Sequence, residues 1–350
     1  MSEVTDAELS SDVDPSLESN RMQDKISEKT GEETPENRRL VPVSIRARYM
    51  TASIASPVVL GLLMSKTEAL PRLPNIALNL LPLLSCPGVG TRQVSEIVEK
   101  DQATAAKLLR WVNSSLFGLE GKVESLHRAV TLLGLDAVRS IVLEDALGRT
   151  IAPSAVPGIS TRTIWRHAAA ASVASKFLAG SVRGQVPDVA ATAGLLHDIG
   201  LLLLITVENK KLEAAIAAAR ATSEPLIAHE DSVIGFNHQV WGEVFVRLWR
   251  LPSTIAFSIG SHHSPLIESF DPLAGILWLA DFLVSCIGFP CPDDMIPQAP
   301  EEEIEELMGM VGLRPPLKRY ITENLVRELV KATQYWPMEK GPSAGICSVS

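Results

Sequence analysis

The sequence of 350 residues is too long for a disulfide-stapled mini-domain and long enough for one large domain or two modest ones. Its 46% of hydrophobic and 21% of charged residues exclude a disordered or collagen-like chain. The formal net charge of −9 disfavours a protein that binds DNA through its phosphates, because such proteins need clustered Lys and Arg.

The acidic charge is concentrated at the start of the chain. Residues 1–40 contain eleven acids and five bases, a net charge of −6, which leaves −3 for the other 310 residues. Because residues 1–48 are also poor in apolar side chains and lack periodicity, they are predicted to form a disordered acidic tail.

The sequence favours a cytoplasmic protein. The first 20 residues carry acids and Ser where a secretory signal needs a basic start and an apolar run. The four Cys residues form no C-x-x-C pair, which is typical of free thiols in a reducing compartment. No stretch has 18 uninterrupted apolar residues, so we expect no membrane span.

Apolar residues at helical spacing predict an all-α protein, and strand patterns are almost absent. Pro and Gly residues near residue 150 divide the helices into two lobes, at 51–150 and 151–290. Residues 291–350 are predicted to be a C-terminal helical extension and tail. The predicted helices lie at 51–69, from 75 to a break at Pro87-Gly88, as two within 91–117, as two within 124–150, and at 161–179, 188–206, 209–221, 239–249, 252–263, 271–287 and 300–310.

Histidines cluster in the second lobe, and this is the most informative chemical feature of the sequence. The chain has seven His residues, and six of them fall within 97 residues: His167, His197, His229, His238, His262 and His263. His167 projects from the apolar stripe of its predicted helix, where a polar group needs a partner. That partner is either a backbone carbonyl in the core or a ligand.

The pair His197-Asp198 lies in a nearly continuous apolar run, where an unpaired carboxylate is very costly. Either a divalent metal ion or a hydrogen bond that pins two helices explains such a pair. His262 and His263 converge on one site only near a helix end, which Gly260 and Pro265 favour.

Asp281 is another lone acid in an apolar run, at 276–284. Its carboxylate either joins the histidines or faces solvent on an amphipathic helix.

The order H, HD, H, HH, D along one helical lobe resembles the HD superfamily of metal-dependent phosphohydrolases. The closer resemblance is to the HDOD domain, the HD-related output domain of bacterial signalling proteins. This resemblance covers roughly residues 66–266 and rests on Leu70-Pro71-Arg72-Leu73-Pro74, on the segments 94–118 and 129–139, and on the run from Trp241-Gly242-Glu243 to His262-His263.

The resemblance implies an HD-like second lobe that holds a metal site. His167, the His197-Asp198 pair and Asp281 would bind one divalent transition metal such as Fe, Mn or Ni. His229 or His238, together with His262 and His263, would extend the site to two metals, with Asp198 as the bridge.

The resemblance also implies a regulatory role in bacterial signal transduction, exerted through contacts with signalling proteins rather than through catalysis. The alternative is a metal-dependent phosphohydrolase that acts on a nucleotide or a cyclic dinucleotide. The branch that cleaves cyclic-di-GMP carries a Gly-Tyr-Pro signature after its paired histidines. This chain has Ser264-Pro265-Leu266-Ile267 there, which disfavours that activity.

Overall fold

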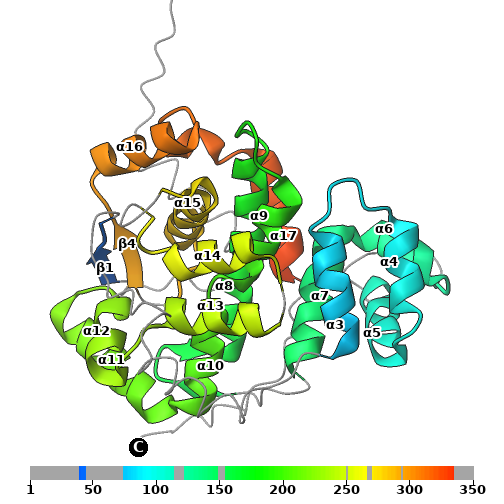
Figure 1. Cartoon of the computed structure of the whole chain (residues 1–350), viewed down its shortest axis with the longest axis horizontal. Helices are drawn as coiled ribbons and strands as arrows, with labels where there is room; N and C mark the ends of the chain where they lie inside the picture. The colour runs from blue at the N-terminus through cyan, green and yellow to red at the C-terminus, as the bar shows by residue number, and fades with distance from the viewer. Residues whose placement is uncertain are drawn as a thin grey trace, which may run out of the picture.

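The computed structural model of the protein describes residues 39–44, 74–113, 122–148, 154–249, 251–265, 270–292 and 295–334. Across these ranges the fold is helical, with two short pairs of strands (Figure 1). The prediction of an all-α fold is therefore confirmed. The predicted helix at 51–69 and residues 1–38 of the predicted tail lie outside the described residues.

The helices of the first half pack against one another on one side of the molecule (Figure 1). Side chains cap two of their N-termini: the Asp101 carboxylate accepts a hydrogen bond from the Thr104 N–H, and the Ser125 hydroxyl accepts one from the Arg128 N–H. The group comprises α3 (Asn75–Leu84), α4 (Thr91–Val98), α5 (Gln102–Val112), α6 (Leu126–Leu133) and α7 (Leu135–Gly148).

In the second half, α8 (Thr161–Ala179) packs against α9 (Pro187–Leu196) and α15 (Pro272–Cys286), and its run of small residues at 168–171 is buried. These small side chains let α9 and α15 pack closely against α8. After the hairpin of β2 (Ala155–Val156) and β3 (Ile159–Ser160) come α8 (Thr161–Ala179), α9 (Pro187–Leu196), α10 (Ile199–Val207), α11 (Asn209–Thr222), α12 (Leu226–Ile234), α13 (His238–Leu248), α14 (Ser253–Ser261) and α15 (Pro272–Cys286).

The single helix predicted at 188–206 is wrong, because the chain turns between α9 and α10. Asp198 has φ −96° and ψ 16°, which departs from helical geometry and starts a new helix. The helix α12 was not predicted, since the buried face of this nine-residue helix includes a charged residue, Glu230, that breaks its apolar pattern.

The stretch formed by α9 and α10, residues 187–207, is the one described helical segment that is long and apolar enough to cross a membrane. Its mean hydropathy is 1.8, and 89% of its most apolar window is buried inside the protein. This burial identifies the stretch as part of the helical core.

The prediction of a disordered tail is wrong for residues 39–44. Strand β1 (Arg39–Pro42) pairs in parallel with β4 (Met295–Gln298), more than 250 residues away in the sequence. Strand pairing of this kind depends on a partner that the local sequence does not reveal. Val41 is buried, and the Val43 N–H donates a hydrogen bond to the Gln298 carbonyl oxygen.

An ion-pair network around the buried Arg139 joins the two groups of helices. The Arg139 side chain in α7 is fully buried and donates hydrogen bonds to the Leu84 carbonyl oxygen, to Asp136 and to Asp188 of α9. Lys176 of α8 pairs with both carboxylates, at 2.9 Å from Asp136 and 3.0 Å from Asp188. The guanidinium therefore helps to set the orientation of α7 relative to α8 and α9.

The end of the described chain returns to the helical body. Helix α16 (Glu301–Val311) packs on α15, and α17 (Glu323–Gln334) packs against both α7 and α8, after the short 3-10 helix η2 (Leu317–Tyr320). The predicted acidic helix at 300–310 corresponds to α16, whereas α17 was not predicted as a separate helix. The proposed division into lobes at residue 150 falls within 149–153, which are outside the described residues, and stays a prediction.

Candidate metal centre

Histidine and aspartate side chains from α8, α13 and α15, from the turn between α9 and α10, and from the end of α14 converge on one buried place. Their ligand atoms form two groups, each with all atoms within 4.8 Å of one another. We call these seven residues the His/Asp cluster: the first group is His167, His197 and Asp281, and the second is Asp198, His238, His262 and His263.

Breaks in helices bring neighbouring residues to the same point. In a continuous helix, consecutive side chains point about 100° apart. The turn between α9 and α10 removes this separation for His197 and Asp198, whose Nε2 and Oδ2 atoms lie 3.4 Å apart. Likewise, α14 ends at Ser261, so His262 and His263 occupy the helix end, as the sequence predicts.

One oxygen of the Asp198 carboxylate faces the first group. Asp198 Oδ2 lies 3.4 Å from His197 Nε2 and 3.6 Å from His167 Nε2. Asp281 Oδ1 lies 3.0 Å from His167 Nε2, and the two imidazole Nε2 atoms are 3.2 Å apart. The Asp281 carboxylate thus joins the histidines rather than facing solvent.

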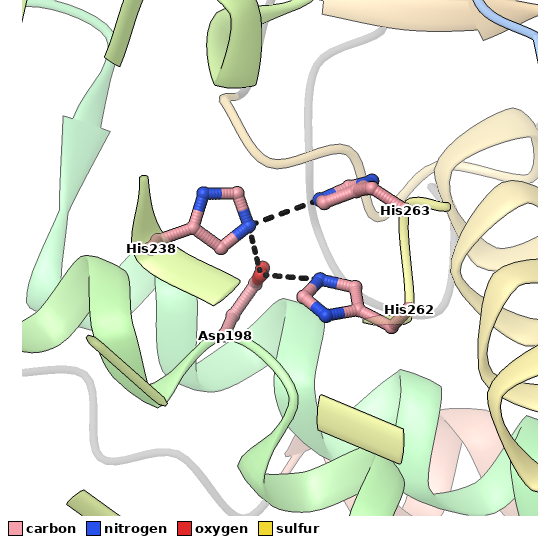
Figure 2. A group of neighbouring side chains, drawn as sticks. All are labelled: Asp198, His238, His262 and His263. Atoms are coloured by element: carbon pink, nitrogen blue, oxygen red, sulfur yellow. Dashed lines mark hydrogen bonds and ion pairs between the residues drawn. The ribbon is translucent and has the colours of Figure 1, made fainter. Parts of the chain in front are cut away.

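The other oxygen of Asp198 faces the second group (Figure 2). Asp198 Oδ1 lies 3.5 Å from His238 Nε2 and 3.7 Å from His262 Nε2. The Nε2 atom of His263 lies 2.9 Å from that of His238. Asp198 therefore stands between two sets of imidazole nitrogens, as a carboxylate that bridges two metal ions does.

The Nδ1 atoms of four cluster histidines contact oxygens outside the cluster, and this leaves each Nε2 directed inward. A hydrogen bond at one ring nitrogen fixes the tautomer and makes the other nitrogen a better ligand. The Nδ1 contacts are His167 with the Phe289 carbonyl oxygen at 2.5 Å, His197 with that of Gly194 at 2.8 Å, His262 with that of Ile259 at 2.6 Å, and His238 with the Glu230 carboxylate at 2.6 Å.

The cluster concentrates opposite charges away from water. Burial lowers the pKa of His197, but the carboxylates of Asp198 and Asp281 outweigh it and raise that pKa to about 9. Burial raises the pKa of Asp281, yet His167 and the other imidazoles hold it well below its usual range. Burial dominates at His263 and lowers its pKa, which favours the neutral imidazole that a metal ion needs.

The donor set fits divalent transition metals. Imidazole nitrogens and carboxylate oxygens are ligands that Fe, Mn, Ni and Zn share. Among the described residues, the buried His262 Nε2 has no hydrogen-bond partner, an arrangement that is costly unless a further group binds there. His238 and His263 also point their Nε2 atoms at each other, and a shared cation would satisfy both. The cluster could therefore bind metal ions.

Of the two histidines between which the sequence left the choice open, His238 lies in the cluster and His229 lies outside it. The His229 Nε2 atom pairs with Glu224 Oε2 at 3.0 Å and with the Thr222 hydroxyl at 3.0 Å. His229 lies in the middle of α12, whereas His238 is the first residue of α13.

Sequence reasoning missed two buried residues that support the cluster. Glu230 Oε2 accepts hydrogen bonds from both the Nδ1 and the backbone N–H of His238, and the side chain is fully buried. Gln239 Oε1 accepts a hydrogen bond from the backbone N–H of His263 at 2.7 Å. The sequence does show a charged residue eight positions before His238. That spacing points to Glu230 only if α12 is known, because the helix places Glu230 beside His238.

A pocket of about 90 Å³ adjoins the cluster. Its walls include cluster atoms and apolar side chains from β1, α12, α15 and β4, and none of its described lining residues is Lys or Arg. The residues from the cluster that line it are Asp198, His238, His263 and Asp281.

Comparison with known families finds a match over the helical part of the chain. The model of the HDOD domain family matches residues 70–265, which is more than half of the 350 residues. An uncharacterized protein of Treponema pallidum (strain Nichols) is 21% identical over 267 residues, which are 75% of this chain and 50% of that protein. The chain thus spans about half the length of this curated relative.

Solved structures share the fold. A Geobacter sulfurreducens HDOD domain protein with unknown function is 22% identical, with a TM-score of 0.62 over 80% of this chain and 98% of that one. A Marinobacter aquaeolei VT8 protein named "Putative signal transduction protein" is 21% identical, with a TM-score of 0.65 over 94% of this chain and 68% of that one. A Shewanella amazonensis SB2B protein named "Putative phosphohydrolase" is 23% identical, with a TM-score of 0.57 over 79% of this chain and 98% of that one.

Proposed function

The chain belongs to the HDOD domain family, and we propose that its His/Asp cluster is a two-metal centre that hydrolyses a phosphate ester. The observation that carries this proposal is the position of Asp198. Its two carboxylate oxygens face separate sets of imidazole Nε2 atoms, at 3.4 to 3.7 Å. A cluster kept only for packing has no need of two complete sets of inward-facing ligands.

The chain's own residues would hold the ions. His167, His197, Asp198 and Asp281 would bind the first, and Asp198, His238, His262 and His263 the second. When bound, divalent transition metals supply Lewis acidity, which polarises phosphoryl oxygens and lowers the pKa of water. The two carboxylates offset part of the positive charge of the ions, and the four Nδ1 contacts keep the imidazoles in place.

The pocket supports a small substrate. With about 90 Å³ and no Lys or Arg among its described lining residues, it offers neither the room nor the extra cations that a large polyanionic ligand requires. Together with the absence of a Gly-Tyr-Pro sequence after His262-His263, this favours a small phosphate ester or a mononucleotide over a cyclic dinucleotide.

A second candidate function is regulation through contacts with signalling proteins in the cytoplasm, with the metal ions structural or sensory. Its support is the name of the Marinobacter protein, whose fold aligns with 94% of this chain. In this case the cluster would bind metal ions without turning over a substrate.

Metal content and phosphatase activity of the purified full chain test the proposal. We expect the wild-type protein to contain close to two transition-metal ions per chain and to hydrolyse p-nitrophenyl phosphate or a member of a mononucleotide panel. Asp198→Asn should lose both metal and activity, because it removes the bridge. His229→Gln is the matched control and should keep both, since His229 lies outside the cluster.

Two outcomes would overturn the proposal. A wild-type protein that stays folded and metal-free after reconstitution with Mn²⁺, Fe²⁺ or Ni²⁺ would exclude a metal centre. A fully metal-loaded protein that is inert towards the whole panel would exclude hydrolysis and favour the regulatory function.

A further inference from the structure

The N-terminal strand β1 and the two residues after it contribute to the wall of the pocket at the His/Asp cluster. Val41, Val43 and Ser44 line the same pocket as Asp198 and Asp281. In Figure 1, β1 (blue) lies beside β4 (orange) at the edge of the second half of the molecule, near α12 and α15. A segment that precedes the whole HDOD match at 70–265 therefore forms part of the wall of its central site.

Strand pairing and hydrogen bonds attach this segment to the rest of the described chain. The parallel pairing with β4 comprises four residue pairs, from Arg39 opposite Met295 to Pro42 opposite Gln298. Beyond it, the Val43 N–H donates to the Gln298 carbonyl oxygen at 2.6 Å, and the Ser44 hydroxyl donates to Glu303 of α16 at 2.8 Å.

The pairing itself is weak. Both strands contain a proline in the paired region, Pro42 in β1 and Pro297 in β4, and a proline has no N–H to donate. Isolated two-stranded sheets are marginally stable, and parallel pairs are the less stable kind. Burial of the Val41 side chain, which is 4% exposed, is therefore a main attachment of the strand.

We propose that the edge of β4 is a binding surface for an extended peptide strand and that residues 39–44 of this chain are its resident occupant. Docked there, the segment closes the pocket over the His/Asp cluster; released, it opens the pocket to small molecules. The surface rests on geometry alone, whereas its consequence for catalysis rests on the proposed function. A partner that competes for this edge would offer an extended, apolar strand, as in other cases of strand addition.

The test measures access to the pocket in the full chain through the thiol of Cys291, which lines the pocket. The rate of its alkylation by a small reagent is compared with that of Cys86, an exposed thiol in the first half of the chain. Val41→Asp places a charge where the strand is buried and should accelerate Cys291 labelling at least tenfold. Pro42→Asp places the same charge on an exposed neighbour in the same strand and should leave the rate unchanged.

Equal Cys291 rates in the wild-type protein, Val41→Asp and Pro42→Asp would overturn the proposal. Val41→Ala provides a milder test in case the charge unfolds the protein, and should give a smaller acceleration in the same direction. An unchanged Cys86 rate and an unchanged melting curve show that the effect is local.

A second measurement separates this inference from the proposed function. Mn²⁺-loaded protein is mixed with an excess of chelator, and Val41→Asp should lose its metal at least tenfold faster than Pro42→Asp. If no variant binds Mn²⁺, the metal centre fails while the thiol test still decides the inference. If Mn²⁺ binds but leaves all variants at the same rate, the strand does not close the centre.

Discussion

Replacing Glu230 with Gln is expected to weaken metal binding at the half of the His/Asp cluster that contains His238. The Glu230 carboxylate is fully buried, and its Oε2 atom lies 2.6 Å from His238 Nδ1 and 2.9 Å from the His238 backbone nitrogen. Burial lowers the pKa of His238, and the Glu230 carboxylate outweighs it and raises that pKa. Gln keeps the shape and an acceptor oxygen but removes the negative charge.

The magnitude follows from the role of the carboxylate. Partners that orient a ligating His are worth about 10-fold to 100-fold in metal affinity, which equals about 1.4 to 2.7 kcal/mol. A hydrogen bond to a charged group contributes about 1.5 to 3 kcal/mol, so the loss of one charge-assisted contact accounts for the effect. The first group should change little, because Glu230 accepts its hydrogen bonds from His238, which belongs to the second group.

Titration of metal-free protein with Co²⁺, followed by calorimetry and visible absorption, measures the two affinities separately. Glu224→Gln is the matched control: Glu224 also pairs with a histidine, His229 at 3.0 Å, but outside the cluster. Its affinities should equal those of the wild-type protein. If Glu230→Gln binds both ions as tightly as Glu224→Gln does, Glu230 does not act through His238, and the reasoning is refuted.

Two further predictions concern packing and pH. Gly200→Ala should lower both the melting temperature and the metal content. A Cβ there would lie 2.0 Å from the His238 carbonyl oxygen and would push α13 away from α10. Gly309→Ala is the control and should be tolerated, because a Cβ at Gly309 meets nothing within 4 Å. Burial raises the pKa of Asp136, but Arg139 and Lys176 outweigh it and lower that pKa below 3.8 in the folded protein. The ionised carboxylate therefore stabilises the fold above its unfolded pKa, and this stability is lost as the pH falls below the unfolded pKa and through the lowered pKa of the folded protein. Urea unfolding should show a shallower loss in Lys176→Met than in the wild-type protein, and equal pH dependence in both would contradict the assignment.

Much of the site was predictable because its residues are out of place in their surroundings. Asp198 and Asp281 are single carboxylates in apolar runs, and burial of an unpaired charge is so costly that each needed a partner. The structure provides those partners at 3.0 to 3.7 Å. The choice between His229 and His238 was not predictable, since it depends on α12, whose apolar pattern Glu230 interrupts.

The sequence by itself determined the helical fold, the family and the residue types that meet in the cluster, since helical periodicity and the cost of burying charge act locally. Only the tertiary structure decided which nitrogen of His167 faces inward, because its Nδ1 atom contacts the carbonyl oxygen of Phe289, which lies 122 residues later in the sequence. The place of β1 was likewise decided by the fold. Its pairing partner lies more than 250 residues away, and a strand of four residues carries too little local preference to reveal it.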